Sequence, residues 1–99
     1  MNPLILIAED DADIRGLLKL YLEGEGFRVL EADNGARALD LAREQSPDMA
    51  ILDIMMPQLN GFELTRALRK FSDIPILILS AKSQDNDKIL GLNLGADDY

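Results

Sequence analysis

Short apolar runs alternate with stretches of helical periodicity along the chain, and this alternation constrains the fold more than any other feature. Four runs have the length and composition of strands: Leu4–Ala8, Phe27–Ala32, Met49–Leu52 and Ile76–Leu79. A helical pattern follows each of them, over residues 14–22, 36–45, 64–71 and 84–94. Strands that alternate with helices predict right-handed parallel crossovers and a sheet covered on both faces.

The four runs differ in polarity, and this difference predicts their places in the sheet. The first, third and fourth are continuously apolar and are expected at the centre, whereas "FRVLEA" at 27–32 has the mixed polarity of an edge strand. The chain has 99 residues, of which 47% are hydrophobic, enough for one domain with a packed core. We therefore expect a single domain over residues 1–99.

Composition excludes several classes of function. Without Cys or His, the chain has no disulfide, no thiolate nucleophile, no Cys/His zinc site and no His general base. The 18 acidic and 10 basic residues give a net charge of −8, which disfavours direct binding to nucleic acid or to an anionic membrane. No signal peptide or membrane span is visible, so the cytoplasm is the expected compartment.

Carboxylates follow two of the predicted strands, where ligands bind in open parallel sheets. Glu9, Asp10 and Asp11 come after the first strand, Asp53 after the third, and Ser80 after the fourth. Convergence of Glu9, Asp10 and Asp53 predicts a site for a hard, oxygen-bound cation: Mg²⁺, Mn²⁺ or Ca²⁺. For Mg²⁺, Asp10 and Asp53 are expected to bind directly and Glu9 through water. Asp53 is also a candidate phosphoryl acceptor, with Ser80 as a hydrogen-bond donor to the phosphoryl group.

Each of these residues also has a purely structural interpretation. Asp11 is expected mainly to cap the first helix, and Asp53 can be an ordinary turn residue. Ser80 can be a capping hydroxyl of a loop, and Asn34-Gly35 is typical of a turn. Each signal is weak alone, but their joint occurrence at three strand ends favours a functional site.

Four segments of the chain resemble the receiver domain of two-component response regulators. They are "ILIAEDD" at 5–11, "AILDIMMPQLNGFEL" at 50–64, "IPILILSAK" at 74–82 and "GLNLGADDY" at 91–99, in the family's order. The most specific is the D-x-M-M-P-x-x-x-G run from Asp53 to Gly61. The resemblance implies a flavodoxin-like (βα)₅ doubly wound parallel sheet of order 2-1-3-4-5. It also implies Mg²⁺-dependent phosphoryl transfer from a sensor histidine kinase to an aspartate.

The resemblance also implies a role for individual residues of this chain. Asp53 corresponds to the phosphoacceptor, and Glu9 and Asp10 to the acidic pair, with Asp10 the direct Mg²⁺ ligand. The backbone carbonyl of Met55 corresponds to the third protein ligand. Ser80 corresponds to the switch hydroxyl, and Tyr99 to the aromatic residue that turns inward on activation. Such a domain is a signalling switch that catalyses only its own phosphorylation and dephosphorylation.

"EDD" and "GADDY" together resemble the OmpR/PhoB-type class, in which the receiver precedes a winged-helix DNA-binding domain that regulates transcription. In that class the face formed by helix 4, strand 5 and helix 5 dimerises on activation. Four residues of this chain match positions on that face: Lys88, Leu92, Asp97 and Asp98.

One part of the family pattern is missing from the 99 residues. The family has a Lys, shortly after the position of Tyr99, that contacts the phosphoryl group. We therefore expect a receiver that lacks most of strand 5 and helix 5 and has no output domain. One alternative is a truncated fragment that is inactive in phosphotransfer and self-associates, through the helix 4/strand 5 region or by strand exchange at the open edge of strand 4. Another is an Mg²⁺-dependent phosphohydrolase, disfavoured because no second Asp closely follows Asp53.

Overall fold

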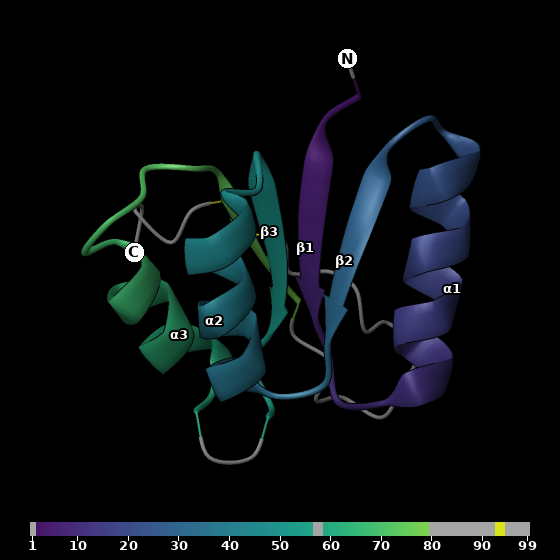
Figure 1. The fold of residues 1–99 in the computed structure, drawn as a ribbon. Coiled ribbons are helices and arrows are strands. Elements are labelled where there is room, and N and C mark those ends of the chain that lie inside the picture. Colours follow the sequence, from purple (N-terminus) through teal and green to yellow (C-terminus); the bar gives the residue numbers. More distant parts are fainter. Residues whose placement is uncertain (1, 57–58, 80–92, 95–99) are drawn as a thin grey trace.

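A five-stranded sheet forms the centre of the molecule in the computed structural model, which describes residues 2–56, 59–79 and 93–94. The strands are β1 (Leu4–Ala8), β2 (Arg28–Ala32), β3 (Met49–Asp53), β4 (Ile76–Leu79) and β5 (Asn93–Leu94). Their order is β2-β1-β3-β4-β5, and the first four are mutually parallel (Figure 1). The predicted edge position of the second strand and the central positions of the first, third and fourth are thus confirmed.

Three helices lie in the described part of the chain: α1 (Ala12–Gly24), α2 (Gly35–Gln45) and α3 (Gly61–Leu68). Figure 1 shows α2 and α3 together in front of the sheet, while α1 lies beside β2. The main core lies between the sheet and the α2/α3 pair, and it contains no side chain of α1. Since side chains alternate along a strand, Leu6 and Leu52 enter this core and Ile7 and Ile51 point to the α1 side.

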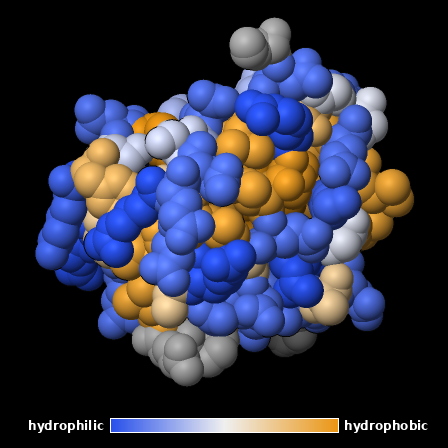
Figure 2. All heavy atoms as spheres, in the orientation of Figure 1, coloured by the Kyte–Doolittle hydropathy of each residue, from blue (hydrophilic) through white to orange (hydrophobic). Residues whose placement is uncertain are grey.

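The apolar face of α1 remains largely open. The helix lies where the periodicity predicts it, but none of its residues is buried. Leu17 and Tyr21 are each 67% exposed, and Ile14 is 40% exposed. In Figure 2 hydrophobic side chains accordingly reach the surface at the outer edge over α1. No helix in the described ranges is both long and apolar enough to cross a membrane.

The last part of the chain differs from the prediction. Asn93 and Leu94, expected at the end of a helix over 84–94, form β5 and pair antiparallel with Ile78 and Leu77 of β4. The outer edge of β4, expected to be open, is therefore paired at these two positions. The edge of β4 offers unpaired N–H and C=O groups, and Asn93 and Leu94 form backbone hydrogen bonds with them. These bonds outweigh the weak helical pattern, which Gly91 already interrupts. Residues 84–92 lie outside the described ranges.

Candidate functional site

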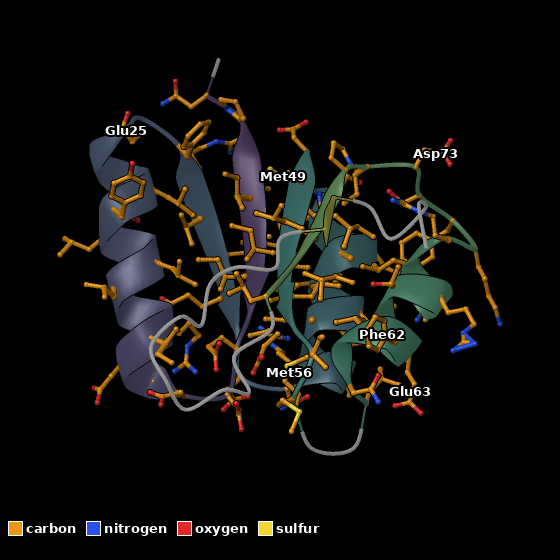
Figure 3. The ribbon with its side chains drawn as sticks, turned by 180° about the vertical axis from the view of Figure 1, so that it is seen from behind. Glu25, Met49, Met56, Phe62, Glu63 and Asp73 are labelled. Carbon is orange, nitrogen blue, oxygen red and sulfur yellow. The ribbon has the colours of Figure 1, made fainter. Side chains whose placement is uncertain are left out.

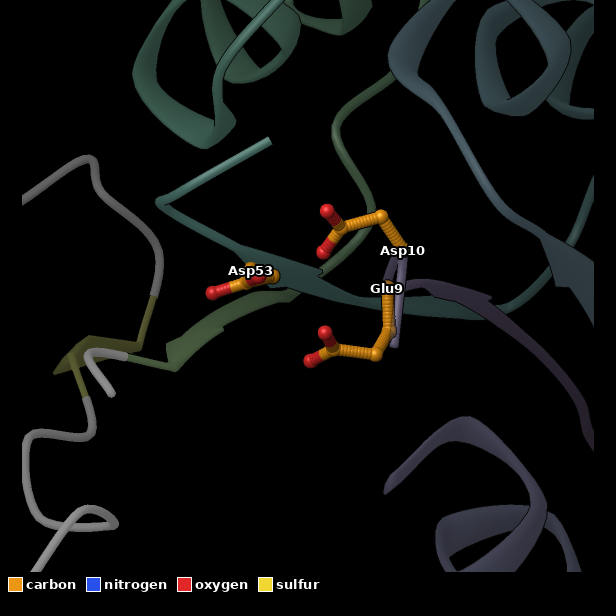
Figure 4. A group of neighbouring side chains, drawn as sticks. All are labelled: Glu9, Asp10 and Asp53. Atoms are coloured by element: carbon orange, nitrogen blue, oxygen red, sulfur yellow. The ribbon is translucent and has the colours of Figure 1, made fainter. Parts of the chain in front are cut away.

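Three carboxylates meet at the carboxyl end of the sheet. The register of β1 and β3 places Ala8 opposite Leu52, so the next residues, Glu9 and Asp53, lie on adjacent strand ends. One carboxylate oxygen from each of Glu9, Asp10 and Asp53 lies within 4.8 Å of the others. Figure 4 shows the three side chains pointing to the same side of the sheet edge. The predicted convergence of these residues is therefore confirmed.

The end of the molecule that holds this site can be followed in Figure 3. Met49, the first residue of β3, lies at one end, and Met56, just after β3, lies at the other. The acidic group lies at the Met56 end, where the parallel strands finish. This is the edge at which open parallel sheets bind their ligands.

Two of the three carboxylates are buried, and burial dominates their electrostatics. Glu9 and Asp53 are each only 3% exposed, whereas Asp10 is exposed. Burial, followed by the negative charges of Asp53 and Asp10, raises the pKa of Glu9 to about 7. Burial also raises the pKa of Asp53, although the hydrogen bond from the Met55 N–H, and then the interaction with Glu9, act to lower it. Burial therefore disfavours two full negative charges on this pair in the metal-free chain.

The backbone of Glu9 is fixed on both sides. Its N–H donates to the Ala32 carbonyl of β2 at 3.0 Å. Its carbonyl accepts a hydrogen bond of 2.8 Å from the Arg15 guanidinium. Its side-chain Oε2 accepts the Asp11 N–H at 3.1 Å. The loop from β1 to α1 is thus tied to β2 and to the first turn of α1.

Asp11 is confirmed as the N-cap of α1. Its Oδ1 accepts the N–H groups of Asp13 at 2.9 Å and of Ile14 at 3.2 Å, which satisfies two of the open donors of the first turn. The Asp11 side chain is therefore engaged in capping α1. Asp10, between Glu9 and Asp11, keeps its carboxylate for the cluster.

Asp53 combines a turn with a place in the cluster. Its Oδ1 accepts the Met55 N–H at 3.2 Å, which is the bond expected of a turn aspartate. The following loop returns close to the strand end, and the Gly61 N–H donates to the Ile54 carbonyl at 3.3 Å. A Cβ on Gly61 would lie 2.7 Å from the Asp53 carbonyl oxygen, so only glycine fits there without a shift of the loop.

The donor set suits a hard divalent cation. All three groups are carboxylates, and their oxygens are close enough to share one ion. Among the described residues, Glu9, Asp10 and Asp53 form the one group of three acidic side chains that could hold a metal ion. Burial, the main cause of the raised pKa values of Glu9 and Asp53, makes their negative charges costly in the metal-free chain. A bound cation would balance these charges.

The remaining site predictions are not tested by the geometry. Met55 lies two residues after Asp53 and is exposed, and the assignment of its carbonyl as a ligand stays a prediction. The expected switch and interface residues lie outside the described ranges: Ser80, Lys88, Leu92, Asp97, Asp98 and Tyr99. Two further residues, Arg15 and Gly61, help to hold the loops of the site, and the sequence analysis assigned neither of them a role. The sequence feature that could have indicated Arg15 is its position as the first basic residue after the three acids.

The family match and the most similar proteins found by comparison agree on one family. The response regulator receiver domain family matches residues 5–99. The chain is 52% identical over 99 residues to the response regulator GtcR of Aneurinibacillus migulanus, covering all of this chain and 41% of that protein. It is 46% identical over 99 residues to the transcriptional regulatory protein CpxR of Escherichia coli, covering all of this chain and 42% of that protein. The chain thus spans about two fifths of the length of these relatives.

Solved structures agree with the fold. The receiver domain of the Francisella response regulator 1452 superposes with a TM-score of 0.77 at 37% identity, over 84% of this chain and 69% of that one. The response regulator protein TrrA of Thermotoga maritima, solved in complex with Mg²⁺-BeF, gives a TM-score of 0.78 at 39% identity, over 84% of this chain and 72% of that one.

Proposed function

The chain belongs to the family of response regulator receiver domains, and from that premise we propose that Asp53 accepts a phosphoryl group from a histidine kinase in an Mg²⁺-dependent reaction. Receiver domains are signalling domains rather than conventional enzymes. The observation that carries the proposal is the group formed by Glu9, Asp10 and Asp53, whose oxygens lie within 4.8 Å of one another at the end of a parallel sheet.

The proposed transfer is a displacement at phosphorus. An Asp53 carboxylate oxygen forms the new P–O bond, and the P–N bond to the donor's imidazole breaks, so that the imidazole nitrogen keeps the bonding electron pair. Asp53 must be ionised to attack, and burial, which raises its pKa, works against that ionised form until positive charge is bound beside it. The turn bond from the Met55 N–H to Asp53 Oδ1 helps to orient the carboxylate at the site.

Asp10 and Asp53 are proposed to hold Mg²⁺ directly, with Glu9 acting through water and the Met55 carbonyl as a further ligand; Mn²⁺ fits the same oxygen donors. When bound, the ion supplies positive charge that offsets the charge on the incoming phosphoryl oxygens. The chain's own part is to fix these oxygens in advance. Glu9 is held by three hydrogen bonds, and Asp53 by β3 and its turn.

Signal output is proposed to follow the family pattern. Ser80 donates to the new phosphoryl group and Tyr99 turns inward, which shifts the domain between two states. Residues 1–99 act as one receiver domain in the cytoplasm, and the altered face includes Lys88, Leu92, Asp97 and Asp98. That face is proposed to support self-association and the control of an output domain. A role in transcription is supported by the similarity to CpxR, a transcriptional regulatory protein.

Intact-mass measurement tests the proposal directly. The 99-residue chain is incubated with Mg²⁺ and acetyl phosphate, a small acyl phosphate donor, beside Asp53→Asn and Asp40→Asn. Asp40 is an exposed residue of α2, so its variant makes the same chemical change away from the site. We expect an Mg²⁺-dependent phosphoryl adduct on the wild type and on Asp40→Asn. An adduct that persists on Asp53→Asn would contradict the proposal.

A further inference from the structure

Arg15 connects three elements around the acidic site through contacts that do not involve the carboxylates of Glu9, Asp10 or Asp53. Its Nη1 donates to the backbone carbonyl of Glu9 at 2.8 Å. Its Nε donates to Oε1 of Glu31 on β2 at 3.2 Å. Its own N–H donates to the Asp11 carbonyl in the first turn of α1. The side chain is only 19% exposed, so this contact is better shielded than an ordinary surface ion pair.

The bond to the Glu9 carbonyl acts on the peptide that joins Glu9 to Asp10. A peptide unit is planar, so holding its carbonyl oxygen also fixes the orientation of the Asp10 nitrogen. Glu9 is held at its N–H by Ala32 of β2, and Asp10 is followed by Asp11, which is held as the helix cap. Arg15 supplies the restraint between these two fixed points.

The planar guanidinium explains why an Arg stands here. Its Nε and Nη1 donate to two acceptors at once in a fixed geometry, which the single ammonium group of Lys cannot reproduce. The Glu31 carboxylate sets the direction of the guanidinium, and the guanidinium sets the direction of the Glu9 carbonyl. The chain of contacts therefore runs from β2 through Arg15 to the loop that carries the acidic pair.

We propose that Arg15 is a positioning residue for the Glu9–Asp10 pair, and that its bridge from Glu31 to the Glu9 carbonyl presets these two acids to bind the divalent cation. This role rests on the proposed function, because it concerns the cation of the same site. It makes Arg15 a second layer around the metal, and such outer contacts commonly change metal affinity by about 10- to 100-fold when they are removed.

Charge alone predicts the opposite effect, which makes the proposal testable. Arg15 is a cation beside a cation site, so its loss should strengthen Mg²⁺ binding if only Coulomb's law mattered. A positioning role predicts weaker binding instead. Lys19 provides the matched control, because it is a cation of the same helix whose ion pair with Glu23, at 3.1 Å, lies within α1.

Calorimetric titration of Mg²⁺ into the metal-free chain at pH 7.5 gives the comparison. We expect Arg15→Gln to weaken Mg²⁺ binding by about 10-fold or more, and Lys19→Gln to leave it unchanged or slightly stronger. Circular dichroism and urea unfolding confirm that each variant is folded. Equal or tighter binding by folded Arg15→Gln would overturn the positioning role and leave the proposed function standing. A wild type that binds no Mg²⁺ would overturn both.

Glu31→Ala approaches the same bridge from its other end and tests it even if Arg15→Gln does not fold. It leaves the Arg15 cation in place and removes its anchor, so Mg²⁺ binding should weaken by more than the screened charge of one partly exposed carboxylate explains. Where Arg15→Gln folds, the loss in the double variant should not exceed that of Arg15→Gln alone, because the two residues act through one contact. Unchanged Mg²⁺ affinity in folded Glu31→Ala, or fully additive losses, would contradict the proposed bridge.

Discussion

Glu9 and Asp53 hold two buried carboxylates at the ends of adjacent parallel strands, with oxygens within 4.8 Å of each other and each residue 3% exposed. The pair is unfavourable for the metal-free fold, since burial raises the pKa of both groups and the negative charge of Asp53 raises that of Glu9 further. The same buried negative charge favours the binding of a divalent cation. The stability of the fold and the binding of the ion are therefore linked through these two residues.

The metal-free chain should lose stability as the pH rises from 4.5 toward 7. In this range the folded Glu9 still holds a proton that the unfolded chain has released, so the folded state binds more protons and its stability falls as they are removed. The contribution of Glu9 to this loss is on the order of 3 to 4 kcal/mol, at roughly 1.4 kcal/mol per pKa unit. Urea unfolding in EDTA across this range measures it. A flat or rising free energy of unfolding would contradict the raised pKa of Glu9.

Glu9→Gln should stabilise the metal-free chain at pH 7.5 and weaken its binding of Mg²⁺. The amide removes one buried negative charge, so the gain is about 1 to 2 kcal/mol, while the cation loses a carboxylate of its site. Urea unfolding with and without Mg²⁺ reads both effects. The control is Glu63→Gln, which lies in the capping box of α3 outside the acidic cluster. If metal-free Glu9→Gln were less stable than the wild type, the charge of Glu9 would not be destabilising in the metal-free fold.

Gly61→Ala should destabilise the chain by about 2 kcal/mol, because its Cβ would lie 2.7 Å from the Asp53 carbonyl oxygen. That neighbour is backbone, so relief requires a shift of the loop that carries the site, and Mg²⁺ affinity should fall as well. Gly16→Ala is the matched control, since its Cβ would meet nothing within 4 Å. In the middle of α1 it should stabilise by about 0.5 to 1 kcal/mol. Thermal unfolding of both variants gives the comparison. Equal changes in stability for the two variants would contradict the close contact between Gly61 and the Asp53 carbonyl.

Asp11→Ala should cost about 1 kcal/mol of stability by removing the N-cap of α1. Asp11→Asn should keep the cap, since an amide oxygen accepts the same two N–H groups. Both variants should retain Mg²⁺ binding, because the cluster uses Glu9, Asp10 and Asp53. Urea unfolding and Mg²⁺ titration separate the two roles. Loss of Mg²⁺ binding in Asp11→Asn would place Asp11 in the metal site rather than at the helix end.

Sequence patterns predicted the strands and the meeting of the acids well, for a simple physical reason. Apolar runs such as Leu4–Ala8 and Ile76–Leu79 match β1 and β4 at both ends, because a parallel strand buried on both faces needs continuous apolar residues. Once the sheet is parallel, its geometry brings Glu9 and Asp53 to one edge. The second helix begins at Gly35, one residue before the predicted start, because Asn34 caps it.

The parts that could not be predicted depend on contacts between distant backbone segments. Nothing in the helical spacing of α1 shows that Leu17 and Tyr21 stay exposed. The contact of Arg15 with the Glu9 carbonyl and the approach of Gly61 to Asp53 arise only when the loops are folded. Phe71 fits the helical spacing of α3, yet it lies beyond the helix end at Leu68, with the Arg43 guanidinium 5.3 Å from its ring centre.

The most direct test of the central claim is to locate the phosphoryl group on the chain. After reaction with acetyl phosphate and Mg²⁺, borohydride reduces an aspartyl phosphate to homoserine, and peptide sequencing by mass spectrometry then identifies the position. The account predicts homoserine at position 53 and nowhere else, and none when Mg²⁺ is replaced by EDTA. Homoserine at Asp10 or at another carboxylate, or an equal yield in EDTA, would contradict it.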